Sequence, residues 1–139
     1  PVNLILLEPR EVDPSGTAVL TDRRAHHVLT VLRAVPGQEL RVGVIDGPIG
    51  RAVMVRHDPG GVTLQCTFDA ATPGRPRVDL LLALPRPKVL RRLWAQVAAL
   101  GVGRVILTNA ERVERHYFDT HLLAPEAVRA LLVEGLEQA

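Results

Sequence analysis

The chain has 139 residues, 47% of them hydrophobic, so it can bury the core of one ordinary domain or of two very small ones. Its single cysteine excludes a disulfide framework and a cysteine-based zinc site. The net charge is only +2, and no apolar run approaches the roughly 20 residues that span a membrane. We therefore expect a cytoplasmic protein with no membrane partner.

The charge is unevenly distributed along the chain. Residues 1–71 contain seven arginines and eight acidic residues, whereas residues 72–104 contain seven basic residues and only Asp79 as an acid. Of the 17 basic residues, 16 are arginine, which binds phosphate bidentately better than lysine does. Such a basic cluster favours a phosphate-rich partner. The four aromatic residues are too few for an RNA module that stacks bases on a row of exposed rings.

The first part, residues 1–71, is predicted to form a small β-barrel or curled sheet with one helix inserted. An apolar segment, 2–7, is typical of a strand, and a second strand begins at 18–20. Thr21 is the expected N-cap of a helix over 22–33. Turns rich in glycine, proline and aspartate predict an antiparallel meander of three further strands, over 39–45, 50–57 and 61–68.

Two adjacent histidines, His26 and His27, lie in this predicted helix. Successive helical residues are about 100° apart, so the two rings do not share a face and cannot form a helical metal site. No metal is therefore expected. Helical spacing gives a core stripe of Ala25, Val28, Leu29 and Leu32. The opposite, polar stripe is Arg23, His26, Thr30 and Arg33.

This polar stripe is interpreted as a surface that faces an anion, and a merely solvated helix face is the alternative. His27 lies at the edge of the core stripe. It is either a ligand contact or a half-buried histidine that is hydrogen-bonded to backbone.

A proline- and glycine-rich linker over 70–77 is expected to separate the second part of the chain. The apolar run 78–84 is typical of a strand that is buried on both faces, and such strands are usually parallel. A helix over 85–100 and a strand over 104–108 complete a right-handed βαβ unit.

The last predicted helix covers 124–139, with an apolar stripe of Val128, Leu131, Leu132 and Leu136. Two parallel strands and two helices form an incomplete α/β layer with an apolar strand edge left open. We therefore expect either that the chain is a fragment or that a partner covers this edge. The alternative is a complete small protein in which an element of the first domain docks on this edge.

Basic residues follow the first strand of the predicted βαβ unit. In open α/β sheets ligands bind beyond the carboxyl ends of the strands, where Arg86 and Lys88 are expected. Lys88, Arg91 and Arg92 are predicted on the exposed side of the following helix. Phosphate binding and a solubilising charged surface are the two interpretations of these four residues.

The loop after the second strand also carries polar side chains. Asn109, Glu111 and Arg112 could reach a ligand at the same edge of the sheet. His116 and His121 could act as bases, but the sequence shows no partner for either, which favours ordinary loop histidines.

Three segments in this order resemble the bacterial small-subunit ribosomal RNA uridine-N3 methyltransferases of the SPOUT superfamily. They are RRAHHVLTVLRAVPGQEL with the following DG (23–47), LLLALPRPKVLRRLWAQVAALGVGRVIL (80–107) and AERVERHYF (110–118). The resemblance implies an α+β chain. A PUA-like RNA-binding barrel would cover 1–71, and the first part of a trefoil-knotted α/β domain would cover 76–139.

The resemblance further implies that the protein methylates N3 of a uridine in 16S ribosomal RNA, with S-adenosylmethionine as donor, and acts as a homodimer. Family positions that face the RNA correspond to His26, His27 and Arg33. Glu111 and Arg112 would lie near the substrate, with Arg112 stabilising a uracil anion.

The family's glycine-rich donor-binding segment lies C-terminal to everything in this chain. The 139-residue polypeptide alone is therefore expected neither to bind S-adenosylmethionine nor to methylate RNA. A stand-alone RNA-binding or assembly module is the alternative. A small-molecule α/β enzyme that uses the basic strand ends is a third hypothesis.

Overall fold

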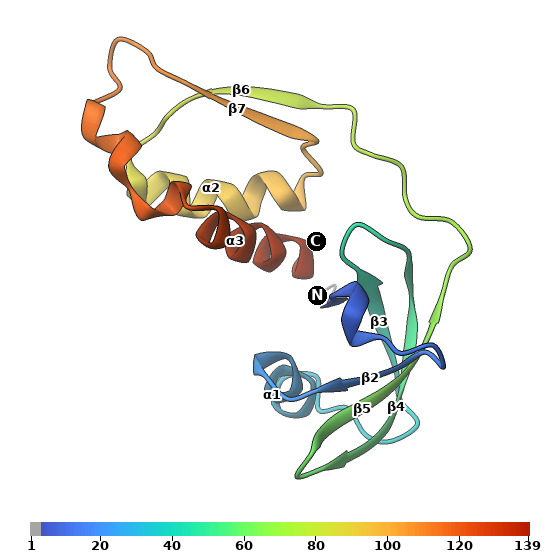
Figure 1. Ribbon diagram of the computed structural model, residues 1–139. Helices are drawn as coiled ribbons and strands as arrows, with labels where there is room; N and C mark the ends of the chain where they lie inside the picture. The colour runs from blue at the N-terminus through green and yellow to red at the C-terminus, as the bar shows by residue number, and fades with distance from the viewer. Residues whose placement is uncertain (1–3) are drawn as a thin grey trace. The chain divides into compact units, whose positions relative to one another are not determined.

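The structure is a computed structural model that describes residues 4–139. The start of the first predicted strand, residues 2 and 3, lies outside the described residues. The described chain divides into two compact units, which we call the first unit (Leu4–Pro73) and the second unit (Gly74–Ala139). Figure 1 colours the chain from one to the other.

The first unit is a curled five-stranded sheet with the strand order β1-β3-β4-β5-β2 (Figure 1). Its strands are β1 (Leu4–Leu7), β2 (Thr17–Leu20), β3 (Glu39–Val44), β4 (Ile49–Asp58) and β5 (Gly61–Phe68). The antiparallel meander β3-β4-β5 is present as predicted. β1 pairs with β3 in parallel and β2 pairs with β5 antiparallel, so these two strands form the edges of the sheet.

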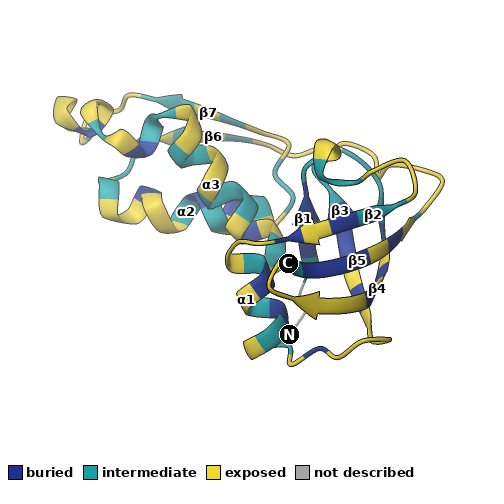
Figure 2. Cartoon of the chain, turned by 60° about the horizontal axis from the view of Figure 1, so that its bottom comes forward, coloured by how far each residue is buried: buried dark blue, intermediate teal, exposed yellow. Residues whose placement is uncertain are grey.

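The inner face of this sheet forms the first hydrophobic core (Figure 2). Burial alternates along β2 and the first half of β4, and Leu7, Leu20, Val42 and Leu64 are fully buried. The single helix of this unit, α1 (Arg23–Thr30), adds Ala25 and Val28 to the same core. The predicted core stripe is thus confirmed: Ala25 and Val28 are buried, and Leu29 and Leu32 pack against them in part.

Both ends of α1 differ from the prediction. The N-cap is Asp22, not Thr21, because its carboxylate accepts the N–H of Arg24 at 2.9 Å. The helix ends at Thr30, and the N–H of Leu32 still reaches the His27 carbonyl oxygen at 3.0 Å. Arg33 has a φ of +50°, which ends the helical path, so its predicted place on the helix is wrong.

The second unit begins with a βαβ element, β6 (Asp79–Ala83), α2 (Pro87–Ala99) and β7 (Arg104–Thr108). β6 and β7 are parallel, as predicted, and Leu81 lies opposite Ile106. Two short 3-10 helices, Arg115–Asp119 and His121–Leu123, then lead to α3 (Pro125–Glu137).

The helices cover only one face of the two-stranded sheet. Leu80, Val105 and Leu107 pack against a core formed by α2, α3 and the loop between β7 and α3. On the other face, Leu81 is 67% exposed and Ile106 is 45% exposed. The prediction that β6 is buried on both faces is therefore wrong, because both helices belong to one core on a single side.

α2 and α3 approach each other closely at Gly135. This glycine is buried, and a Cβ atom there would overlap the Ala95 carbonyl oxygen and lie 2.7 Å from the Ala95 Cα. Val128, Leu131 and Leu132 of the predicted stripe do face the core. Leu136 does not: it is 38% exposed, because Gly135 takes the position against α2.

Candidate functional site

The predicted anion-facing residues of the first unit lie at α1 and just after it. Arg23 and His26 are exposed on the helix, and Arg33 is exposed beyond its end. His27 is half-buried, as one of its two interpretations required, but no described residue hydrogen-bonds its ring. The structure thus brings Arg23 and His26 to one exposed helix face and places Arg33 in the loop that follows.

Arg24 fastens the start of α1 to the sheet. Its Nη1 donates to the Leu6 carbonyl oxygen at 2.8 Å and to Glu11 Oε2 at 2.8 Å. Its Nη2 donates to Glu11 Oε1 at 2.5 Å and to Asp22 Oδ2 at 2.7 Å. We call these four residues the Arg24 clamp. Arg24 was not predicted as a functional or structural residue, because its partners lie up to 18 positions away along the chain.

The clamp perturbs the protonation of its members. Hydrogen bonding to Arg24 lowers the pKa of Glu11 and of Asp22 below their ordinary values, although partial burial opposes the shift. The same carboxylates raise the pKa of Arg24. All three groups are therefore charged at neutral pH, and α1 starts from a fixed position.

In the second unit, the loops that follow β6 and β7 meet at one edge of the sheet. Because the strands are parallel and Ala83 lies opposite Thr108, their carboxyl ends are side by side. Arg86, in the loop after β6, donates from Nε to the Tyr117 hydroxyl at 3.3 Å. The Tyr117 hydroxyl donates to Glu114 Oε1 at 3.4 Å.

The chain of contacts continues to a histidine. Glu114 Oε2 lies 3.3 Å from His116 Nδ1, and the His116 ring packs edge-on against Tyr117 with the ring centroids 4.8 Å apart. We call Arg86, Glu114, His116 and Tyr117 the strand-end cluster. Tyr117 is only 6% exposed, so its ring belongs to the hydrophobic core while its hydroxyl joins the polar chain.

The strand-end cluster changes two expectations from the sequence. His116 does have a partner, Glu114, so the expectation that it has none is wrong. Tyr117 and Glu114 were not predicted as site residues. The sequence signal for their contact was their spacing of three residues, since residues i and i+3 lie on the same side of a 3-10 helix.

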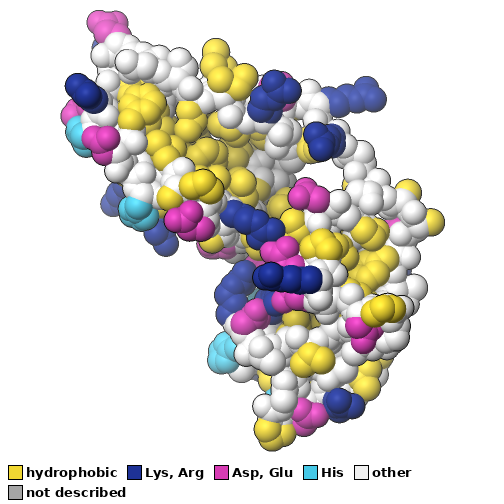
Figure 3. Space-filling model, in the orientation of Figure 1, with side chains coloured by type: hydrophobic (Ala, Val, Ile, Leu, Met, Phe, Trp, Pro, Cys, Tyr) yellow, Lys and Arg dark blue, Asp and Glu magenta, His cyan; other side chains and the backbone are white. Residues whose placement is uncertain are grey.

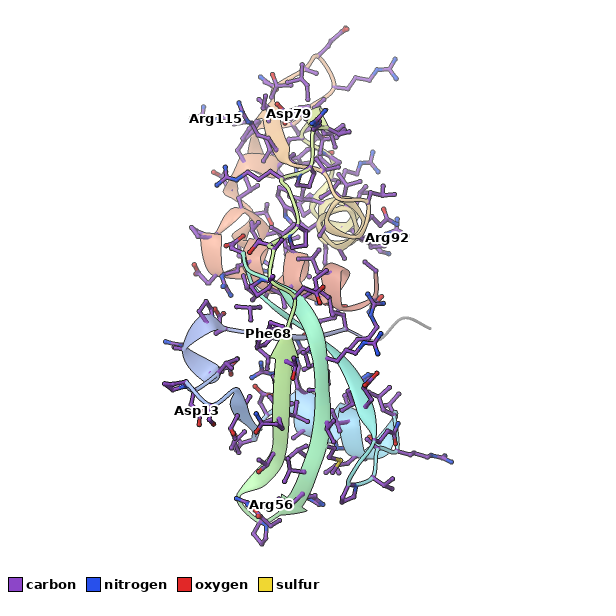
Figure 4. All side chains as sticks on the ribbon, turned by 90° about the vertical axis from the view of Figure 1, so that its right-hand side faces the viewer. Asp13, Arg56, Phe68, Asp79, Arg92 and Arg115 are labelled. Atoms are coloured by element: carbon purple, nitrogen blue, oxygen red, sulfur yellow. The ribbon has the colours of Figure 1, made fainter. Side chains whose placement is uncertain are left out.

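The other predicted basic residues of this unit are exposed on α2. Lys88, Arg91 and Arg92 all face solvent, as predicted. Arg92 projects outward from the helix in Figure 4. Figure 3 shows a broad hydrophobic area on the visible face of this unit, with basic and acidic side chains around it.

Glu111 and Arg112 lie in a tight turn after β7, in which the Val113 N–H donates to the Ala110 carbonyl oxygen at 2.9 Å. Both side chains are exposed. His121 is also exposed, at the start of the second 3-10 helix. This turn directly precedes Glu114 of the strand-end cluster in the sequence, and no hydrogen bond or ion pair within the described residues joins Arg112 to that cluster.

Residues 4–139 include no group of three histidine, cysteine, aspartate or glutamate side chains that could hold a metal ion. In the same described range, no helix has both the length and the apolar character that crossing a membrane requires.

The fold and these side chains define a class of protein: an α+β chain of two units that presents arginines at the carboxyl ends of parallel strands, a place suited to an anionic ligand.

Comparisons with known proteins make this class more specific. Residues 73–139 match the RNA methyltransferase domain family. The chain is 32% identical over 141 residues to ribosomal RNA small subunit methyltransferase E of Treponema pallidum. That alignment covers 99% of the chain but 53% of the relative, so the chain spans about half the length of the curated relative it matches.

Solved structures have the same fold. The ribosomal RNA small subunit methyltransferase E of Neisseria gonorrhoeae, bound to S-adenosyl methionine, superposes with a TM-score of 0.70 at 17% identity, covering 99% of this chain and 56% of that one. A putative methyltransferase of Legionella pneumophila with bound cofactor SAM gives 0.68 at 18% identity, with 99% and 58% covered.

Proposed function

We propose that the chain is part of a ribosomal RNA methyltransferase that transfers a methyl group from S-adenosylmethionine to N3 of a uridine in 16S ribosomal RNA. The observation that carries the proposal is the match of residues 73–139 to the RNA methyltransferase domain family, in the unit where exposed arginines lie at the strand ends. The protein would act in the cytoplasm as a homodimer.

Each unit has a part in this proposal. The first unit would be a PUA-like RNA-binding domain, supported by its curled sheet and the basic residues at α1. The second unit would be the beginning of a SPOUT domain, supported by its parallel βαβ element. The proposed RNA contacts are Arg23, His26, His27, Arg33, Arg86, Lys88, Arg91, Arg92 and Glu111.

The chemistry requires that N3 of uracil lose its proton as the methyl group is transferred. Holding the base and the donor in contact would supply much of the rate. A guanidinium near the uracil oxygens would stabilise the negative charge that develops on the ring. Arg112 is the proposed source, because it is exposed in a short turn beyond the carboxyl end of β7.

The residues of this chain do not by themselves fit the donor. The two loops at the carboxyl ends of the strands, 84–86 and 109–114, contain no glycine, so their backbones cannot approach a cofactor as closely as a glycine-rich turn does. The donor would instead be bound by residues that the longer relatives have beyond the matched segment.

The modification can be tested in cells. A methyl group on N3 of uracil blocks Watson–Crick pairing, so it stops reverse transcriptase one nucleotide before the modified base. We expect a stop in small-subunit ribosomal RNA that disappears when the gene is deleted and returns with the intact gene. Loss of a different methyl group would contradict the uridine-N3 specificity but not the proposed methylation of ribosomal RNA. Unchanged methylation, together with RNA binding, would favour a stand-alone RNA-binding module.

A further inference from the structure

We propose that Tyr117 is a positioning residue that presents the Arg86 guanidinium to a phosphate group of the RNA. The inference rests on the proposed RNA-modifying function and adds to it a specific contact and the residue that arranges it. The observation behind it is the hydrogen bond from Arg86 Nε to the buried tyrosine's hydroxyl, at 3.3 Å.

Tyr117 is a fixed anchor. The residue is 6% exposed, and its ring packs in the core that α2, α3 and the 3-10 helices share. Packing in this core therefore fixes the position of the ring. Its hydroxyl can accept one hydrogen bond and donate another. It accepts from Arg86 and donates to Glu114, so both functions of the hydroxyl are used.

Arg86 is held by its backbone as well. It lies between Pro85 and Pro87, and a residue before proline is restricted to extended conformations. Its φ of −54° and ψ of 143° agree with that restriction. An arginine whose backbone and Nε are both fixed loses little conformational freedom when a ligand binds.

The rest of the guanidinium is available to a ligand. An arginine has five N–H donors, and within the described chain only Nε of Arg86 has a partner. Both terminal nitrogens can therefore donate to two oxygens of one phosphate, which is the strongest arrangement for an arginine. Glu114 does not neutralise Arg86 directly, because the Tyr117 hydroxyl lies between them.

The surroundings favour a phosphate. The first turn of α2 has no acidic residue, and Lys88 is exposed two positions after Arg86. Residues 72–104 carry seven basic side chains and a single acidic one, which favours a phosphate on this side of the site. The carboxylate of the strand-end cluster, Glu114, accepts a hydrogen bond from the Tyr117 hydroxyl.

A double-mutant cycle tests the proposal with the variants Tyr117→Phe, Arg86→Gln and both together. The probe is a fluorescein-labelled, uridine-containing RNA hairpin, titrated with the 139-residue chain between about 50 and 200 mM KCl. We expect Tyr117→Phe to raise Kd roughly three- to tenfold, the effect of one lost hydrogen bond. Arg86→Gln should raise it further and reduce the salt slope by about 0.7–0.9, as loss of one phosphate contact does.

The decisive result is the coupling. In the Arg86→Gln background, Tyr117→Phe should have no further effect, because the hydroxyl acts only through that arginine. Arg51→Gln is the matched control: it removes the same charge from an exposed arginine of the first unit and should change Kd less than Arg86→Gln does. The fluorescence of Trp94, buried in the same core as Tyr117, checks that each variant folds.

Three outcomes would overturn the inference. Wild-type Kd in Tyr117→Phe would show that the hydroxyl is not used, and an equal loss in both backgrounds would show that it acts independently of Arg86. In both cases the proposed function would still stand, because the wild-type chain binds RNA. If the wild-type chain fails to bind RNA at low salt, both the inference and the RNA-binding part of the proposed function are wrong.

Discussion

Replacing Arg24 by methionine should destabilise the first unit strongly. Methionine keeps much of the apolar length of the side chain but removes every donor of the Arg24 clamp. The part-buried Leu6 carbonyl oxygen loses its partner, which costs about 1 kcal/mol. The Glu11 carboxylate, 25% exposed, loses two charge-assisted hydrogen bonds, which cost about 2 kcal/mol. The Asp22 pair is half exposed and adds little.

The expected loss is therefore about 3 kcal/mol in the free energy of unfolding, or roughly 150-fold in the unfolding equilibrium. Urea unfolding followed by ¹H–¹⁵N NMR measures it, since each assigned amide reports on the unit to which it belongs. Amides of the second unit serve as the internal reference. Arg51→Met, which breaks only the exposed pair with Glu39, should cost less than about 0.5 kcal/mol.

The effect should also depend on pH. Arg24 lowers the pKa of Glu11 from its ordinary value of 4.5 and that of Asp22 from 3.8, so the folded state favours their ionised forms. Their contribution is present at neutral pH and is lost as pH falls through and below those ordinary values. The difference between wild type and Arg24→Met should shrink at about pH 3. A difference that is small at pH 7, or equal at both pH values, would refute this reasoning.

Three further predictions concern the second unit. Gly135→Ala should lower the stability of the second unit by about 2 kcal/mol, because the overlap with the Ala95 backbone outweighs the ~1 kcal/mol gain in helix propensity. Thermal melting followed by Trp94 fluorescence measures this loss, and Ala130→Gly, on the exposed side of α3, calibrates the propensity effect. A stabilised Gly135→Ala variant would mean that α2 and α3 can separate freely. Arg91→Gln and Arg92→Gln should each weaken RNA binding and reduce the salt slope by about 0.7, measured by fluorescence anisotropy against Arg51→Gln; unchanged slopes would leave them as solvated side chains. Calorimetric titration of the 139-residue chain with S-adenosylmethionine should give no binding heat, and a stoichiometric isotherm would contradict the assignment of the donor site to residues beyond it.

Local patterns predicted most of the elements. The meander was predictable because turn residues separate three short apolar runs, and the βαβ element because helical spacing lies between two apolar strands. The end of α1 was not, because an arginine in the left-handed region leaves no signal in hydrophobic periodicity. The prediction that β6 is buried on both faces was wrong for a similar reason, because an apolar run does not reveal whether one or two layers cover a strand.

For the candidate sites, the sequence predicted the exposure of single residues but not the contacts between residues far apart in the chain. The exposure of Lys88, Arg91 and Arg92 followed from helical spacing. The contact between Arg86 and Tyr117 spans 31 positions, and the one between Arg24 and Glu11 spans 13, so both depend on how the elements pack. The stabilisation of a uracil anion by Arg112 and the contact of His27 with RNA stay predictions.

The uncovered face of the β6–β7 sheet affects how preparations of this chain should be judged. Leu81 and Ile106 offer an apolar surface to hydrophobic dyes although the helices behind them are packed. Anilinonaphthalene sulfonate fluorescence is commonly taken as the mark of a molten globule. Here a bright dye signal is expected from the native fold, so near-ultraviolet circular dichroism of Trp94 and Tyr117 is the better criterion of correct folding.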